Sequence, residues 1–320
     1  MGRIRVAAFL AAWLLAAGAR AATLDLASGG LTYTAATGAV NALTVSLSAG
    51  TYTIDDPGES AVTLSAGASA AGCASLDANT VTCPRAAISS WNVQLGDQND
   101  TASLAAVLEP TTIRGGTGND TITGGAGADN FLWNPGDASD FVDGGPGADT
   151  FSFTAANINE SLAVSAIPNG FQLTRDIANV VLQVVNVEAL NMQALGGDDT
   201  VTTHPLANTS QTIDGGAQTA SDTLNYDAGG VCTTQGTGSF QTLGAQPVTF
   251  TGFEAVNLQN ECTVFPVAID VSAGVLTYSA GTGDVNALTV SLAGGNYTIH
   301  DAGTPAITLG SAATTAGCFN

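Results

Sequence analysis

The sequence predicts an all-β protein made of β-sandwich-like or β-solenoid modules that include a short coil of strands. Three observations support this prediction. Short runs of alternating or β-branched residues recur, Gly, Asp, Asn and Pro separate them, and two nine-residue blocks of one form follow each other without a gap. No convincing amphipathic helix follows the N-terminal segment. The predicted strands include residues 43–47, 61–64, 80–83, 92–95, 170–175, 180–185, 247–250 and 255–258.

The first 21 residues have the features of an export signal. Arg3 and Arg5 precede an apolar, Ala-rich run over residues 6–18, and residues 19–21 fit a small-x-small cleavage site. The run is shorter than the ~20 residues that a membrane-spanning helix needs, which favours cleavage over a membrane anchor. We therefore expect a mature chain that starts at Ala22, has no membrane span and is secreted or displayed at the cell surface.

The chain is strongly acidic. It has 27 acidic residues against 6 basic ones, all arginines, and a net charge of −21. Such a chain repels nucleic acid and anionic membranes, so a metal cation is the obvious counter-ion. Acidity for solubility alone is the alternative, but it does not explain why so many aspartates gather in glycine-rich turns. Within residues 97–149 these are Asp97, Asp100, Asp120, Asp129, Asp137, Asp140, Asp143 and Asp149.

The five cysteines favour disulfides, as expected for an exported chain. Cys73 and Cys83 are close enough in sequence to close a local loop, and this is the pair that we predict. A Cys232–Cys262 pair is a second, weaker prediction. Cys318 is then left over.

The chain contains a long tandem repeat. Residues 31–73 and 276–318 are identical at 27 of 43 positions without a gap, which gives a period of 245 residues. The second copy ends two residues after Cys318, so we expect a fragment of a longer multi-module protein in which this cysteine has its partner further on. His300 stands where the first copy has Asp55, so the module does not require a histidine there.

Nine-residue blocks of the form Gly-Gly-x-Gly-x-Asp-x-apolar-x predict a cation-binding segment. Residues 115–123, 124–132 and 144–152 are complete blocks, and residues 135–143 are a degenerate one. The glycines allow a tight turn with positive φ, while turn carbonyls and the Asp carboxylate supply hard oxygen ligands that favour Ca²⁺ over zinc. The candidate metal-site residues are Gly115, Gly116, Gly118, Asp120, Gly124, Gly125, Gly127, Asp129, Asp140, Gly144, Gly145, Gly147 and Asp149.

Each block should form one turn and one strand, so that two blocks make one coil and turns stack eighteen or so residues apart. The Asp120 turn should then stack on the Asp140 turn, and the Asp129 turn on the Asp149 turn, with residues 133–134 as a two-residue insertion. A thin core should form from Ile122, Phe131 or Leu132, Val142 and Phe151. Without metal the stacked carboxylates repel one another, and with metal the binding energy becomes folding energy.

Residues 115–152 resemble the haemolysin-type, or RTX, calcium-binding repeat. The resemblance implies a parallel β-roll with Ca²⁺ as its cofactor. Residues 95–101, 196–201 and 214–224 resemble further, degenerate turns. Exported RTX toxins usually lack a cleaved N-terminal signal and carry their repeats toward the C-terminus. The chain differs in both respects, so we expect RTX repeats inside a larger tandem-repeat surface protein of bacterial type.

Groups that carry catalysis are scarce. The chain has two histidines, His204 and His300, and neither a His-Glu-x-x-His nor a Gly-x-Ser-x-Gly motif. We predict a non-enzymatic, structural or adhesive protein whose partners are calcium ions and cell-surface or matrix components. The alternative is the calcium-stabilised part of an exported hydrolase or toxin with its catalytic domain elsewhere. A carbohydrate-binding module is a third possibility, although for Trp91 and Trp133, the candidate stacking platforms, packing in the core or on strands is the favoured interpretation.

The predicted organisation has five parts. They are a signal peptide (1–21), a β module with the Cys73–Cys83 loop (22–110), the calcium-binding roll (111–153), a second β zone with degenerate turns (154–265) and a truncated second copy of the first module (266–320).

Overall fold

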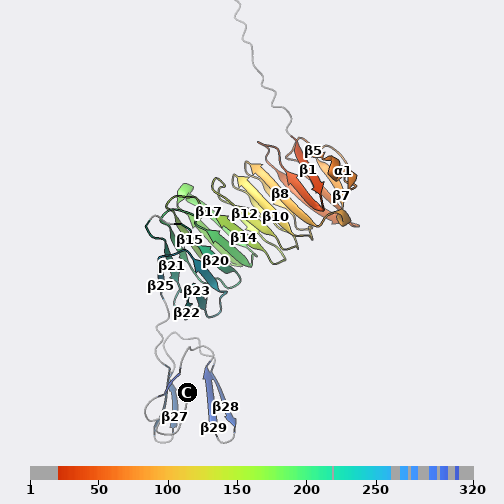
Figure 1. Cartoon of the computed structure of the whole chain (residues 1–320). Helices are drawn as coiled ribbons and strands as arrows, with labels where there is room; N and C mark the ends of the chain where they lie inside the picture. Colours follow the sequence, from red (N-terminus) through yellow and green to blue (C-terminus); the bar gives the residue numbers. More distant parts are fainter. Residues whose placement is uncertain are drawn as a thin grey trace, which may run out of the picture.

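The computed structural model describes residues 21–217 and 220–260, together with the strands at 267–272, 275–279, 288–293, 296–301 and 307–309. Two large sheets run through residues 22–259, and in Figure 1 their strands lie side by side along the long axis of this body. Alternate residues of both sheets are buried in one hydrophobic core. The predicted all-β fold is therefore confirmed.

The first sheet has twelve strands. In spatial order they are β22 (Thr233–Gly236), β23 (Ser239–Thr242), β24 (Val248–Thr251), β20 (Ser210–Asp214), β18 (Ala189–Gln193), β14 (Thr150–Thr154), β12 (Asn130–Trp133), β10 (Thr111–Thr117), β8 (Ser90–Asp97), β2 (Gly30–Thr34), β1 (Ala22–Ala27) and β5 (Val62–Leu64).

The second sheet has thirteen strands. They are β25 (Ala255–Gln259), β21 (Thr223–Asp227), β19 (Thr200–Thr203), β15 (Ser161–Ile167), β16 (Gly170–Arg175), β17 (Val180–Val185), β13 (Phe141–Asp143), β11 (Thr121–Thr123), β9 (Thr101–Ser103), β3 (Ala42–Ser48), β4 (Thr51–Asp55), β7 (Thr80–Pro84) and β6 (Ala74–Ser75).

The strands from β8 to β14 alternate between the two sheets and form a parallel coil. β8, β10, β12 and β14 are neighbours in the first sheet, and β9, β11 and β13 are neighbours in the second. Ile122 pairs with Val142, and Phe131 pairs with Phe151. All four side chains are buried, as the sequence predicts. Leu132, the alternative to Phe131, lies on the outer face of the sheet and is partly exposed. The roll is a parallel coil with inward-facing apolar residues.

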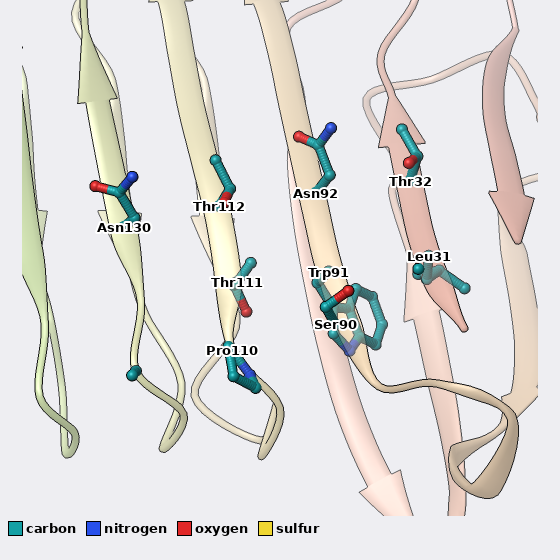
Figure 2. Close-up of a pocket in the computed structure, with 11 residues that line it drawn as sticks. Leu31, Thr32, Ser90, Trp91, Asn92, Pro110, Thr111, Thr112 and Asn130 are labelled. Atoms are coloured by element: carbon teal, nitrogen blue, oxygen red, sulfur yellow. The ribbon is translucent and has the colours of Figure 1, made fainter. Parts of the chain in front are cut away.

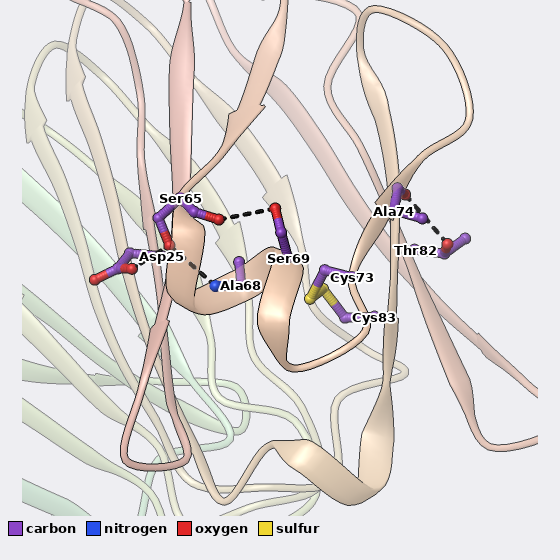
Figure 3. Close-up of a disulfide and its surroundings, with 8 residues drawn as sticks. All are labelled: Asp25, Ser65, Ala68, Ser69, Cys73, Ala74, Thr82 and Cys83. Carbon is purple, nitrogen blue, oxygen red and sulfur yellow. Dashed lines mark hydrogen bonds between the residues drawn. A yellow bond between two sulfur atoms is a disulfide. The ribbon is translucent and has the colours of Figure 1, made fainter.

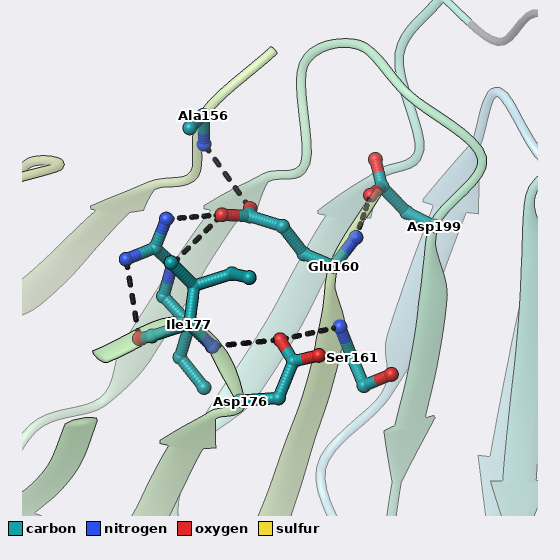
Figure 4. A network of polar contacts seen from close by, with 7 residues as sticks. Ala156, Glu160, Ser161, Asp176, Ile177 and Asp199 are labelled. Carbon is teal, nitrogen blue, oxygen red and sulfur yellow. Dashed lines mark hydrogen bonds and ion pairs between the residues drawn. The ribbon is translucent and has the colours of Figure 1, made fainter. Parts of the chain in front are cut away.

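An antiparallel hairpin interrupts the coil after β13. β16 pairs antiparallel with both β15 and β17, so two extra strands separate β13 from β15 in the second sheet. Arg175 at the end of β16 is buried; it forms an ion pair with Glu160 and lies 5.6 Å from the Trp133 ring. Figure 4 shows the polar contacts of Glu160, which also accepts a hydrogen bond from the Ala156 amide.

The N-terminal end of the body is closed by two hairpins and a short helix. β1 pairs with β2 and β3 pairs with β4, while the helix α1 (Ala66–Ala70) packs beside β1. This helix was not predicted; the Ser65 side chain caps it by accepting the Ala68 amide hydrogen bond. Within the described residues no helix is long and apolar enough to cross a membrane.

The predicted Cys73–Cys83 disulfide is present, next to α1 (Figure 3). Cys232 is also disulfide-bonded. Cys262 and Cys318 lie outside the described residues, as do the predicted signal residues 1–20.

The second copy of the repeat reproduces the strands of the first. β26 (Val267–Ser272) pairs antiparallel with β27 (Val275–Ser279) and parallel with β30 (Ile307–Leu309). β28 (Leu288–Ala293) pairs antiparallel with β29 (Asn296–Asp301). β1 makes the same pairings with β2 and β5, and β3 with β4. The internal repeat is therefore a repeat of strand pairing as well as of sequence.

Both large sheets continue across residues 110 and 153, where the sequence suggests module boundaries. The predicted division into modules stays a prediction.

The outer face of the first sheet carries rows of uncharged polar side chains. Thr32, Asn92, Thr112 and Asn130 occupy neighbouring register positions on four adjacent strands (Figure 2). They line a shallow groove, and none of its lining residues is acidic, basic, His or Cys.

Candidate metal centre

The acidic residues of the turns stack into three columns along the coil. In each column a side-chain oxygen of one turn accepts the backbone N–H of the turn before it, at 2.7–2.9 Å. We name them the first column (Asn41, Asp100, Asp120, Asp140), the middle column (Asp129, Asp149, Glu188) and the last column (Glu160, Asp199, Asp222, Glu254).

The predicted stacking of turns is present. Asp140 accepts the Asp120 amide at 2.8 Å, and Asp149 accepts the Asp129 amide at 2.8 Å. Both pairs are 20 residues apart rather than 18. The longer spacing fits the insertion predicted at residues 133–134, where Trp133 ends β12 and stacks on Phe153 with ring centroids 4.6 Å apart. The insertion thus places Trp133 in the core and keeps the turns in register.

Half of the ten carboxylates in the columns are buried with one oxygen unused. Eight buried side-chain nitrogen or oxygen atoms in the described part of the chain lack a hydrogen-bond partner, and five of them are aspartate oxygens of the columns. A buried carboxylate oxygen without a partner is costly, so a native protein is expected to satisfy it with a donor or a cation. The five oxygens are the Oδ2 atoms of Asp100, Asp120, Asp149, Asp199 and Asp222.

Burial also makes these groups reluctant to ionise. It raises the pKa of Asp120 and Asp149 from 3.8 to about 6, and neighbouring carboxylates add to the effect. The pKa of Asp140 rises to about 8 for the same reasons. Burial likewise raises the pKa of Asp129. A divalent cation beside these carboxylates would oppose both causes, because it replaces lost solvation and offsets the mutual repulsion.

The four predicted ligands are not equivalent. Asp129 uses both oxygens, accepting the Thr111 and Gly125 amides at 2.9 and 2.7 Å. Asp140 lies in the degenerate turn, where Asp137 pairs with Arg114 at 3.1 Å and accepts the Asn134 amide at 2.9 Å. Asp120 and Asp149, each with an unused oxygen, have the environments best suited to a metal ion.

The predicted glycines hold the turns close together. A Cβ added at Gly124 would collide with the Gly144 carbonyl oxygen, and one added at Gly147 would collide with that of Gly127. Gly116 and Gly118 adopt φ of +95° and +131°, which side chains of L-residues rarely allow. The glycines therefore bring backbone carbonyl oxygens of one turn against the next turn.

The oxygen donors fit a hard cation. Within the described residues no three His, Cys, Asp or Glu side chains form a ready-made metal cluster. A site here would combine an aspartate oxygen with backbone carbonyl oxygens, which is a donor set that calcium accepts. Asp149 with the turn at 144–147 would hold such an ion, and Asp120, beside the turn at 115–118, offers an unused oxygen for another.

The sequence pattern does not reveal some members of the columns. Glu160, Glu188 and Glu254 take the place of Asp, outside any nine-residue block. Glu188 follows the inserted hairpin, so it is 39 residues from Asp149 in sequence although it is the next residue in the column. A regular spacing cannot reveal it. His204 is partly exposed, and its Nδ1 lies 2.9 Å from the Val164 carbonyl oxygen.

A family model supports the same segment. The model of the RTX calcium-binding nonapeptide repeat, with four copies, matches residues 111–132 and 136–154. The gap between the two matched stretches falls at the Trp133 insertion. No curated protein sequence matches the chain significantly. Residues 111–154 are therefore RTX calcium-binding repeats folded as a parallel β-roll, and the chain is a repeat protein that contains repeats of this family.

Proposed function

We propose that the chain binds Ca²⁺ between its stacked turns and that the bound ions lock the coil. The observation that carries this proposal is the set of buried aspartate oxygens without a partner, at Asp120 and Asp149 in the matched repeats. Calcium would neutralise the carboxylates and let them stay ionised inside the coil. The parallel strands and glycine turns of the chain hold the carboxylates and carbonyls in register.

The binding energy of each ion would add to the stability of the fold. Extracellular calcium modules bind with Kd of roughly 10⁻⁴ to 10⁻³ M. At tenfold excess over Kd one site contributes about 1.4 kcal/mol, so several sites acting together are needed for a marked effect. A column of stacked turns supplies several sites in series.

We further propose a secreted or cell-surface location and a non-enzymatic, structural or adhesive role. Three features support it: the export-signal pattern of residues 1–21, the 245-residue repeat and the Cys73–Cys83 disulfide. Calcium is abundant outside cells and scarce inside, so such modules would stiffen after export. The uncharged polar faces of the sheet would then be available for contact with matrix or surface components.

The direct test is calorimetry of the full chain. Titration with Ca²⁺ should show binding in the submillimolar to millimolar range, and thermal scans should show a higher Tm in calcium than in chelator. Magnesium at the same concentration is the control for ionic strength, and it should give a smaller shift. No binding at millimolar calcium, or the same Tm in calcium and chelator, would contradict the proposal.

A further inference from the structure

The turn at residues 95–100 stacks directly on the first matched turn, 115–120. Gly96 is in register with Gly116, and the Asp100 amide donates to Asp120 Oδ1 at 2.9 Å. The Asn119 amide donates to Asn99 Oδ1, also at 2.9 Å. These links connect the two turns in the same way as the Asp120 and Asp140 turns are connected. The family match, however, begins only at residue 111.

The two turns also share their backbone path. Both turns have positive φ at the same two positions: +100° and +82° at Gly96 and Gln98, and +95° and +131° at Gly116 and Gly118. Gln98 thus adopts a left-handed conformation in the place where the repeat has its third glycine. The geometry of the repeat therefore extends one turn beyond the residues that carry its sequence pattern.

A steric reason explains why position 98 carries glutamine where the repeat has glycine. A Cβ added at Gly116 would collide with the Gly96 carbonyl oxygen, and one added at Gly118 would collide with the Gln98 carbonyl oxygen. Gly116 and Gly118 are thus required by the turn at 95–100 that is stacked before them. A Cβ added at Gly96 would meet nothing within 4 Å, so the turn at 95–100 is under no such pressure.

The space between these turns is lined by oxygen. Asp100 is 1% exposed and Asp120 is 2% exposed, and the Oδ2 atom of each has no hydrogen-bond partner. The carbonyls of Gly96 and Gln98 face the second turn. No positive side chain is hydrogen-bonded to either Asp. Two buried carboxylates with unused oxygens and adjacent carbonyls form a donor set for a hard divalent cation.

We propose that Asp100 and Asp120 bind an additional divalent cation, Ca²⁺, between the turns at 95–100 and 115–120. This proposal rests on the proposed function of the matched repeats. Asn41 holds the other face of Asp100, its backbone amide and Nδ2 donating to Asp100 Oδ1 at 2.7 and 3.2 Å. The first column therefore begins with Asn41, whose neutral amide takes the place of a carboxylate.

The test is to count calcium ions on the full chain by native mass spectrometry. Asp100→Asn should lose one ion relative to wild type, whereas the surface control Asp25→Asn should lose none. Asp149→Asn, in the middle column, should also lose at least one ion. An unchanged count in Asp100→Asn together with a lower count in Asp149→Asn would overturn this site alone. No calcium on the wild type would overturn the proposed function as well.

A crystal of the wild-type chain grown in calcium covers the case in which Asp100→Asn does not fold. The anomalous difference map should show a peak between the turns at 95–100 and 115–120. A peak between the turns at 124–129 and 144–149 without one at the first position would refute the additional site and leave the proposed function standing. No peak at either position would contradict both.

Discussion

Replacing Asp149 by asparagine should reduce the calcium-dependent part of the protein's stability without harming the metal-free protein. Asp149 is fully buried; its Oδ1 accepts the Asp129 amide at 2.8 Å and its Oδ2 has no partner. The asparagine side chain keeps an oxygen for the Asp129 amide. It removes the negative charge that the metal ion would neutralise.

The expected size follows from the burial of the carboxylate. Burial raises the pKa of Asp149 from 3.8 to about 6, which corresponds to on the order of 3 kcal/mol against the charged form at neutral pH. In chelator the variant should therefore be as stable as wild type, or more stable by up to about 3 kcal/mol. In about 10 mM Ca²⁺, the increment that calcium adds should be smaller than in wild type by at least about 1.4 kcal/mol.

The assay is urea unfolding of both proteins in calcium and in chelator, with Asp25→Asn as the surface-charge control. Asp129→Asn should lower the same calcium increment, and the double variant should lose less than the sum because both residues serve one stacked pair of turns. Equal calcium increments in wild type and Asp149→Asn would refute the metal role of this residue. Fully additive losses in the double variant would refute the shared site.

Three further predictions concern pH, turn geometry and the inserted hairpin. Burial raises the pKa of Asp120 and Asp149 to about 6 and that of Asp140 to about 8, which favours the protonated folded state. In chelator, the stability that these groups contribute is therefore present below about pH 4 and is lost as the pH rises through these values. The calcium increment should grow over the same range, and a pH series of urea unfolding in which the increment stays flat would contradict this. Gly118→Ala should destabilise the protein by about 1–3 kcal/mol more than the control Gly50→Ala. Both glycines have positive φ, but only a Cβ at Gly118 would collide with a carbonyl oxygen, that of Gln98. Equal losses of stability in thermal unfolding would count against the close stacking. Arg175→Met should lower the free energy of unfolding by about 3–5 kcal/mol because it leaves Glu160 buried and unpaired. Adding Glu160→Gln should restore most of that stability. A double variant no more stable than the single one would show that the pair does not act through charge.

The sequence predicts the roll well because its signals are local. Each nine-residue block specifies its own turn, strand and inward residue, so Ile122, Val142 and Phe151 could be assigned to the core from the pattern alone. The pattern left open whether Phe131 or Leu132 faces the core, and the structure places Phe131 there. The stacked pairs of turns followed from the same reasoning. The Cys73–Cys83 pair was also within reach, because ten residues separate the two cysteines.

The parts of the structure that the sequence did not reveal depend on contacts between distant residues. The hairpin at β16 inserts two strands into one sheet only, and this moves Glu188 next to Asp149 across 39 residues. The turn of Asp100 is recognisable in the sequence only as a degenerate one, because Gln98 stands where the repeat has its third glycine. α1 is five residues long and depends on a single serine cap.

Hydrogen exchange of the full chain with and without calcium tests the central claim most directly. The backbone amides of Asp100, Asp120 and Asp129 each donate to a carboxylate of the next turn. If calcium locks the stacked turns, exchange within residues 111–154 should slow strongly when calcium is added, and the outer hairpins at β1–β4 should change little. Exchange rates in residues 111–154 that are the same in calcium and in chelator would contradict the claim.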